Sequence, residues 1–341
     1  MPDLSFVIPA YNEADRLGAG MARLHTAITA GALQPETTEF IVVDDGSSDD
    51  TSDYARVQFD AFPHVQVIRL PENRGKGAAV QAGVAAATAA LVVFADADMA
   101  IDPVQLPQFL TALSAHDLAI GSRAASGASV DRPSLRRSLM NRTFNGFVNA
   151  VTHLGLDDTQ CGFKAFRGPA ARLLFHYCRT EGWAFDVEIL GLARRLGLSI
   201  AQVPVHWSRV RDSRVRSWAD SLPMARDVLQ ARKTSDGQTI AGCRVTLRAD
   251  ASEADTDFLL ALRRVWPVLQ VGDEELLVLF PLQDNSGAAG QTAALQAQLG
   301  SEQAVGVSIT LGQLAARAPL SLHSDIAESR LRRTEPGAAA T

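Results

Sequence analysis

Four short apolar runs in the first hundred residues constrain the fold of this chain more than any other feature. They are LSFVI at 4–8, EFIVVDD at 39–45, VQVIRL at 65–70 and ALVVFAD at 90–96, and helix-like segments separate them. Apolar runs without strict alternation indicate strands buried on both faces, and intervening helices indicate a parallel, doubly wound sheet. Ligands of such sheets bind at the carboxyl ends of the strands. We therefore expect the polar residues after these runs to form one site.

The composition argues against several classes of protein. A net charge of −6 argues against nucleic-acid binding. The N-terminal segment lacks the basic start of a secretory signal, and no uninterrupted run of about 20 apolar residues, the length of a membrane-spanning helix, occurs. Cys161, Cys178 and Cys243 are far apart and odd in number, which fits a reducing compartment. We expect a cytoplasmic protein that at most rests on the inner face of a membrane.

The pattern of the chain changes after Lys233. The segment TSDGQTIAG is typical of a linker, and a second series of strand-like and helix-like segments follows it. We expect an α/β domain with a doubly wound, mostly parallel sheet at 1–233, a linker at 234–242, a smaller α+β domain at 243–325 and a disordered tail at 326–341.

The residues after the first two runs are candidates for binding a nucleotide. Tyr11 and Glu13 follow the first run in VIPAYNE and offer a ring for stacking and a carboxylate. Asp44 and Asp45 follow the second run in VVDDGSSDDT, and such carboxylates suit ribose hydroxyls or a base. The alternatives are a simple turn at the first position and capping of the next helix by residues 47–49 at the second.

Two loops further along the chain suit an activated phosphate. In FADADMAID, Asp96 and Asp98 can place one carboxylate on a sugar or ribose and the other on Mg²⁺ or Mn²⁺, which neutralises a departing diphosphate. Asp102 in the same stretch is interpreted as the cap of the next helix. In ENRGKGAAVQAG, Lys76 lies between two glycines before a helix and suits a phosphate. The spacing of an NTPase P-loop is absent.

Arginines gather at 123–142 and 204–233 in this acidic chain. They suggest an anionic substrate, although a solvated charged face accounts for many such runs. A phosphate acceptor is already anionic and needs positioning by Arg, whereas a hydroxyl acceptor needs a carboxylate base. Asp186 and Glu188 are the best candidates for that base, with a structural role as the alternative. The segment 134–154 is interpreted either as an interfacial helix near a lipid or as a helix packed on the sheet.

Eight motifs occur in the order typical of family 2 glycosyltransferases. They are VIPAYNE, IVVDDGSSDDT, NRGKGAAVQAG, FADADMA, GSR at 121–123, DTQCGFKAFR at 158–167, GWAFDVEIL at 182–190 and VPVHW with SRV at 203–215. They cover about 1–230 and most resemble the branch that includes dolichyl-phosphate β-glucosyltransferase and dolichyl-phosphate mannose synthase. The resemblance implies a GT-A fold and inverting transfer of a hexose from a nucleotide sugar, UDP-glucose or GDP-mannose, to a polyprenyl phosphate.

The resemblance also implies roles for single residues. Those that would contact the nucleotide are Pro9, Tyr11, Glu13 and Asp44. Those that would hold donor or acceptor phosphates are Arg123, Arg214 and one of Arg136 and Arg137. Asp96 and Asp98 would contact the sugar or the metal diphosphate, with Asp98 the direct ligand of Mg²⁺ or Mn²⁺. Relatives with DADLQ carry Gln where this chain has Ala100, so coordination of the metal is expected to be sparser here.

Two other functions stay open on the sequence. The acceptor could be a soluble hydroxyl compound, with Asp186 or Glu188 as base. The chain could also be an inactive nucleotide-sugar sensor coupled to the second domain. The region of VGDEELLVLF at 271–280 resembles a degenerate GGDEF domain that has lost one glycine and the aromatic residue. We expect this domain to serve regulation or association, including assembly into a homo-oligomer.

Overall fold

The computed structural model contains two compact units, at Met1–Gly237 and Gln238–Thr341. The residues that it describes are 2–131, 135–208, 221–237, 240–246, 267–270, 275–280 and 308–314. The boundary falls inside the predicted linker at 234–242. Most of that segment is regular structure, however, because residues 234–237 complete one helix and residues 240–242 begin a strand.

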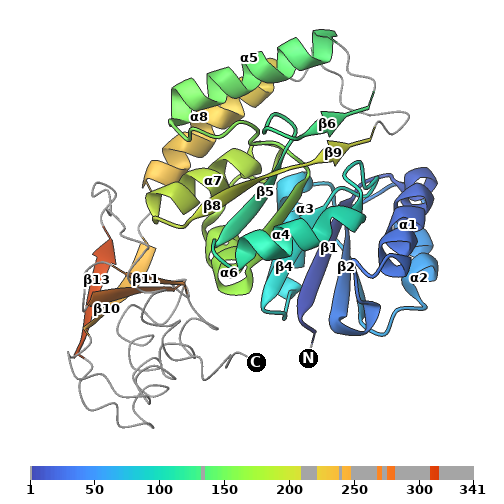
Figure 1. The fold of residues 1–341 in the computed structure, drawn as a ribbon, viewed down its shortest axis with the longest axis horizontal. Helices are drawn as coiled ribbons and strands as arrows, with labels where there is room; N and C mark the ends of the chain where they lie inside the picture. The colour runs from blue at the N-terminus through green and yellow to red at the C-terminus, as the bar shows by residue number, and fades with distance from the viewer. Residues whose placement is uncertain are drawn as a thin grey trace, which may run out of the picture. The chain divides into compact units, whose positions relative to one another are not determined.

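A seven-stranded sheet forms the centre of the first unit (Figure 1). Its strands lie in the order β3 (Val65–Arg69), β2 (Thr38–Asp44), β1 (Leu4–Ala10), β4 (Leu91–Ala95), β7 (Phe163–Arg167), β5 (Leu118–Ser122) and β8 (Ile200–Pro204). Strand β7 is antiparallel to both of its neighbours, and the other pairings in this sheet are parallel. This arrangement confirms the predicted α/β fold with a mostly parallel sheet.

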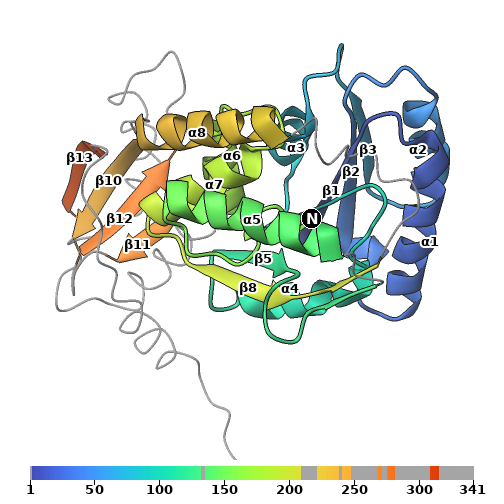
Figure 2. The same cartoon turned by 90° about the horizontal axis from the view of Figure 1, so that it is seen from above.

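Helices cover both faces of this sheet (Figures 1 and 2). On one face lie α1 (Ala14–Thr29), α2 (Thr51–Phe59) and α4 (Leu106–Leu113), and on the other lie α3 (Lys76–Ala86), α6 (Gly168–Tyr177) and α7 (Phe185–Arg195). The prediction of buried strands is wrong for β3, where Val65 is 37% exposed. Strand β3 lies at an edge of the sheet, so solvent reaches residues that a second neighbouring strand would cover.

The strands bury alternate residues against the two helical layers. Phe6 packs on the α1 face, with its ring centroid 6.1 Å from that of Phe40. Val7 points to the opposite face, where an added Cβ on Gly83 of α3 would lie only 2.3 Å from its Cγ1. The small residues of α3 therefore let this helix approach the sheet closely. Burial of a large apolar side chain such as Phe6 contributes about 1.5–3 kcal/mol to the free energy of unfolding.

Smaller elements complete the first unit. They are the 3-10 helices η1 (Pro35–Thr37) and η2 (Pro103–Gln105), the paired strands β6 (Ser129–Val130) and β9 (His206–Trp207), and the helices α5 (Leu135–Thr152) and α8 (Ser221–Gly237). Helices α5 and α8 lie side by side (Figures 1 and 2). None of the helices in the described part of the chain is long and apolar enough to cross a membrane.

The second unit contains a four-stranded antiparallel sheet. Its order is β11 (Val268–Gln270), β12 (Glu275–Phe280), β10 (Ile240–Thr246) and β13 (Ser308–Leu314). Strand β10 pairs with both β12 and β13, and β11 pairs with β12. The helices expected in this unit, and residues 271–274 of the GGDEF-like signature, lie outside the described residues. The resemblance to a GGDEF domain stays a prediction.

Candidate active site

The order β2-β1-β4 brings three strand ends together at one edge of the sheet. Tyr11, which follows β1, is 41% exposed there. The two loops after β1 and β2 are joined, because the backbone N–H of Asn12 donates to Oγ of Ser47 at 2.8 Å and that of Glu13 donates to Oγ1 of Thr51 at 2.8 Å. Asn12 adopts a φ of 51°, a left-handed conformation that Asn tolerates. The edge is therefore held by loop-to-loop hydrogen bonds.

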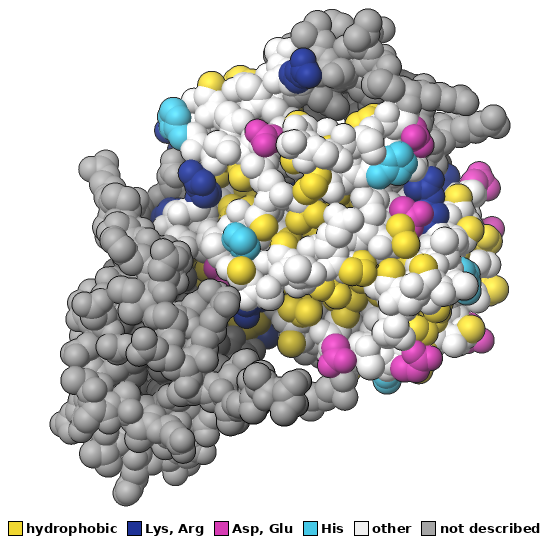
Figure 3. All heavy atoms as spheres, viewed as in Figure 1, with side chains coloured by type: hydrophobic (Ala, Val, Ile, Leu, Met, Phe, Trp, Pro, Cys, Tyr) yellow, Lys and Arg dark blue, Asp and Glu magenta, His cyan; other side chains and the backbone are white. Residues whose placement is uncertain are grey.

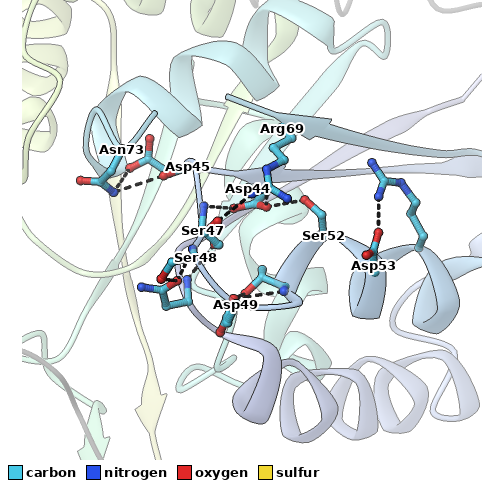
Figure 4. A network of polar contacts seen from close by, with 12 residues as sticks. Asp44, Asp45, Ser47, Ser48, Asp49, Ser52, Asp53, Arg69 and Asn73 are labelled. Atoms are coloured by element: carbon cyan, nitrogen blue, oxygen red, sulfur yellow. Dashed lines mark hydrogen bonds and ion pairs between the residues drawn. The ribbon is translucent and has the colours of Figure 1, made fainter. Parts of the chain in front are cut away.

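Asp44, the last residue of β2, lies at the centre of a network of polar contacts with the loop that follows (Figure 4). Its carboxylate accepts the N–H of Ser47 at 2.8 Å and the hydroxyl of Ser52, and it lies 3.8 Å from Nε of Arg69. The side chain is fully buried. Of the predicted caps, only Asp49 accepts a backbone N–H at the start of α2, that of Thr51. Asp44 therefore shapes the loop that the sequence assigned to the nucleotide.

Asp45 ties the same strand end to the loop before α3. It accepts the side chain of Asn73 at 2.8 Å and the N–H groups of Arg74 at 2.9 Å and Gly75 at 2.7 Å (Figure 4). Burial raises the pKa of this carboxyl, although the two backbone donors oppose the shift. Gly75 has a φ of 111°, which only glycine adopts readily. These contacts fix the position of Lys76, the next residue.

Lys76 and Asp96 form an ion pair at this edge, with Nζ 2.6 Å from Oδ1. The side chain of Lys76 is 11% exposed, that of Asp96 is 39% exposed, and the ammonium lies 5.2 Å from the ring centroid of Trp183. Burial lowers the pKa of Lys76, but the nearby carboxylates, chiefly Asp96, outweigh it and raise the pKa. Lys76 therefore contacts one of the predicted metal-diphosphate residues directly.

Asp98 has a cation of its own, Arg16 of α1. Nη2 of Arg16 lies 2.5 Å from Oδ2 of Asp98, and its Nη1 lies 2.8 Å from Oε1 of Glu13. Burial and the charge of Asp96 raise the pKa of the Asp98 carboxyl, and Arg16 opposes the shift. Arg16 was not among the residues that the sequence motifs indicated. Its position three residues after Glu13, one helical turn along the chain, was the available signal.

Gly162 lets β7 approach Asp96. Its carbonyl accepts the N–H of Asp96 at 3.1 Å, and an added Cβ on Gly162 would lie 1.9 Å from Oδ2 of that residue. Gly162, in the stretch DTQCGFKAFR, therefore lies against the carboxylate of the candidate site. Asp102 lies outside it, because its side chain accepts the N–H of Val104 and caps η2. The predicted cap role of Asp102 is thereby confirmed, and the roles of Asp96 and Asp98 toward a sugar or metal stay predictions.

Arg123 points its guanidinium at a carboxylate of the same protein. Its Nε and Nη2 donate to the two oxygens of Asp158 at 2.7 and 2.9 Å. Burial lowers the pKa of Arg123, but the contact with Asp158 outweighs this effect and raises it. Burial likewise raises the pKa of Asp158, but Arg123 outweighs this effect and lowers it. Arg214 and the side chains of Arg136 and Arg137 lie outside the described residues. The phosphate-binding roles of Arg123, Arg214 and one of Arg136 and Arg137 stay predictions.

Both candidate bases are buried in polar contacts. Oδ1 of Asp186 lies 2.7 Å from Nζ of Lys164, with side chains 2% and 0% exposed. Burial raises the pKa of Asp186, against the effect of Lys164. Glu188 accepts the backbone N–H groups of Arg179 at 3.1 Å and Thr180 at 2.8 Å. These contacts match the structural alternative that the sequence left open for both residues.

Comparison with known proteins agrees with this architecture. Residues 5–175 match glycosyl transferase family 2. The chain is 33% identical to the dolichyl-phosphate beta-glucosyltransferase of Dictyostelium discoideum, over 67% of this chain and 73% of that protein. It is 35% identical to the enzyme of that name from Homo sapiens, over 67% of this chain and 74% of the relative.

A solved structure has the same fold. It is glucosyl-3-phosphoglycerate synthase from Mycobacterium tuberculosis, in complex with Mn²⁺, uridine diphosphate and glucosyl-3-phosphoglycerate. The TM-score is 0.51 at 22% identity, and the match covers 69% of this chain and 80% of that one. The likeness extends to the mostly parallel sheet and confirms the expected GT-A architecture. Together with the sequence matches, it shows that this chain belongs to glycosyl transferase family 2.

Proposed function

We propose that this protein is an inverting glucosyltransferase that moves glucose from UDP-glucose to a polyprenyl phosphate. The observation that carries the proposal is the pair Asp96 and Asp98 after β4, each in contact with a cationic side chain. The pair shares its edge of the sheet with the nucleotide candidates that follow β1 and β2. The names of the curated relatives add the sugar and the class of acceptor.

The side chains at this edge fit a divalent cation that binds together with a diphosphate. Asp96 and Asp98 supply oxygen ligands, and both are partly open to solvent. The described residues contain no group of three or more Asp, Glu, His or Cys able to hold a metal. Mg²⁺ commonly takes one or two carboxylates and completes its shell with phosphate oxygens and water. When bound, the ion would neutralise the charge of the departing diphosphate.

Side chains of the protein can also stabilise the leaving diphosphate of the nucleotide sugar. The leaving diphosphate gains negative charge as the glycosidic bond breaks, and preorganised donors stabilise that charge. Lys76 is held at the edge by Asp45 through the Gly75 loop and by Asp96 directly. We propose that its ammonium contacts the donor phosphates and that the exposed ring of Tyr11 stacks on the base.

A phosphate acceptor suits the environment of the two candidate bases. A hydroxyl acceptor needs a carboxylate within hydrogen-bond reach to take its proton. Oδ1 of Asp186 is instead engaged by Lys164, and both oxygens of Glu188 accept backbone N–H groups. A phosphate monoester is already anionic at neutral pH and needs no such base. Because a polyprenyl phosphate resides in a membrane, we propose that the protein works at a membrane surface.

The test is nucleotide release by the purified chain with Mg²⁺ or Mn²⁺. We expect UDP release from UDP-glucose that depends on added undecaprenyl phosphate, and little release from GDP-mannose. Asp98→Asn should abolish it, whereas the matched change Asp102→Asn, in the same stretch but at the cap of η2, should leave it near the wild-type rate. Absence of lipid-dependent release from every nucleotide sugar would overturn the proposal. Release that depends on a soluble sugar would identify a hydroxyl acceptor instead.

A further inference from the structure

Arg16 links the two halves of the proposed site. Its two terminal nitrogens contact Glu13, a nucleotide candidate, and Asp98, a metal candidate. The side chains of Arg16 and Asp98 are each 17% exposed, so water and salt screen this ion pair less than a surface pair. The Nε–H of Arg16 is buried, and none of the described residues accepts a hydrogen bond from it. Arg16 thus retains one donor for a further anionic group.

The helix that carries Arg16 also shapes the acid loop. One turn further along α1, an added Cβ on Gly20 would lie 2.2 Å from the carbonyl oxygen of Ala97, so only glycine permits this approach. Another turn on, Nη1 of Arg23 donates to the carbonyl of Met99 at 2.6 Å. Residues at i, i+4 and i+7 share one face of a helix. One face of α1 therefore holds residues 97–99 of the acid loop.

Both oxygens of Asp98 are already engaged in this arrangement. Oδ2 lies against Arg16, and Oδ1 accepts the N–H of Ala100 at 3.1 Å. A divalent cation that takes Asp98 as a ligand has to share the carboxylate with these donors, and the positive charge of the adjacent guanidinium disfavours it. The guanidinium is the competitor that carries charge, and it lies on a side chain that can turn away, whereas the N–H of Ala100 is fixed in the backbone.

We propose that Arg16 is the built-in counter-cation of Asp98 and is displaced when metal and nucleotide diphosphate enter together. Without nucleotide, the guanidinium occupies Oδ2 and keeps the affinity for a lone divalent cation low. With nucleotide, the displaced guanidinium pairs with a phosphate oxygen while the cation takes Asp98. Arg16 is thereby a positioning residue that couples metal binding to donor binding. The inference rests on the metal site of the proposed function.

The experiment is titration of the full chain with Mn²⁺, followed by the EPR signal of free Mn²⁺, without and with UDP. A charge-assisted hydrogen bond corresponds to about tenfold or more in an equilibrium constant. In Arg16→Met we therefore expect Mn²⁺ alone to bind about tenfold more tightly than in the wild type. The gain in Mn²⁺ affinity on adding UDP should shrink by about tenfold or more. Arg16→Lys, which keeps the charge, should lie close to the wild type.

Arg23→Met is the matched control, because Arg23 lies on the same face of α1 and holds the same loop through a backbone carbonyl only. Its Mn²⁺ affinity should equal that of the wild type. Unchanged or weaker Mn²⁺ binding in Arg16→Met would overturn the inference. If Arg16→Met unfolds, Arg16→Gln, which keeps a neutral hydrogen-bond donor, should show the same tightening. Loss of Mn²⁺ binding in Asp98→Asn supports the metal site separately, and unchanged binding there would refute that site rather than the role of Arg16 alone.

Discussion

Replacement of Lys164 by Met tests the buried ion pair between β7 and α7. Nζ of Lys164 lies 2.7 Å from Oδ1 of Asp186 and 2.6 Å from the carbonyl oxygen of Cys161. Met keeps the length of the side chain but leaves the carboxylate buried without its nearest cation. Removal of one partner of a buried pair typically costs about 3–5 kcal/mol. We expect a loss of that size in the free energy of unfolding at pH 7.

The dependence of this loss on pH follows from the ionisation of Asp186. The carboxyl has an ordinary pKa of 3.8, and burial raises it in the folded protein against the effect of Lys164. Without Lys164 the folded variant takes up a proton more readily than the unfolded chain, so its stability falls as pH rises above the ordinary pKa. Protonating a carboxyl of ordinary pKa 3.8 costs about 4.35 kcal/mol at pH 7 and about 1.63 kcal/mol at pH 5. The loss should therefore shrink on acidification, by at most about 2.7 kcal/mol between these pH values.

Urea unfolding followed by circular dichroism at pH 7 and pH 5 measures both quantities. Lys233→Met, the same change at an exposed lysine of α8, is the control and should shift stability by less than about 0.5 kcal/mol. The double change Lys164→Met with Asp186→Leu should recover most of the loss, because no unpaired charge stays buried. A loss that is equal at both pH values, or below about 1 kcal/mol at pH 7, would refute the reasoning.

Two further predictions concern the site edge and the buried thiols. Gly162→Ala should lower the rate of sugar transfer about 100-fold with little loss of stability, because the new Cβ must displace the carboxylate of Asp96; a normal initial rate would contradict this. Cys161 and Cys178 are buried free thiols, and burial raises the pKa of both, that of Cys161 to about 12. In a Cys243→Ser background they should react with a chromogenic disulfide only after unfolding, and rapid labelling of the native protein would show that solvent reaches them.

The sequence was sufficient for most of the sheet and for placing the candidate acids at one of its edges. Strands covered on both faces must be apolar along their length, so each central strand was visible as a run that ended in polar residues. Because parallel strands end at the same edge, acids as distant in sequence as Asp44 and Asp96 could be assigned to one place. The edge strand β3 was the exception. Its run of apolar residues predicted a strand buried on both faces, but it does not indicate that β3 lies at the edge of the sheet.

The partners of the charged side chains required the tertiary structure. Arg16 is 82 residues from Asp98, Arg123 is 35 from Asp158, and Lys164 is 22 from Asp186. Runs of arginine predicted an anionic ligand, whereas Arg123, a member of the first run, lies against a carboxylate of the protein itself.

The face seen in Figure 3 likewise shows the described charged side chains dispersed over the surface rather than gathered in one patch. The sequence by itself thus determined the fold class, because burial leaves a pattern along the chain, and its motifs indicated the family and the edge of the candidate site. The tertiary structure decided which carboxylate each cation neutralises. The strength of each charge pair depends on a separation of a few ångströms between elements far apart in sequence, and local sequence patterns do not predict such separations.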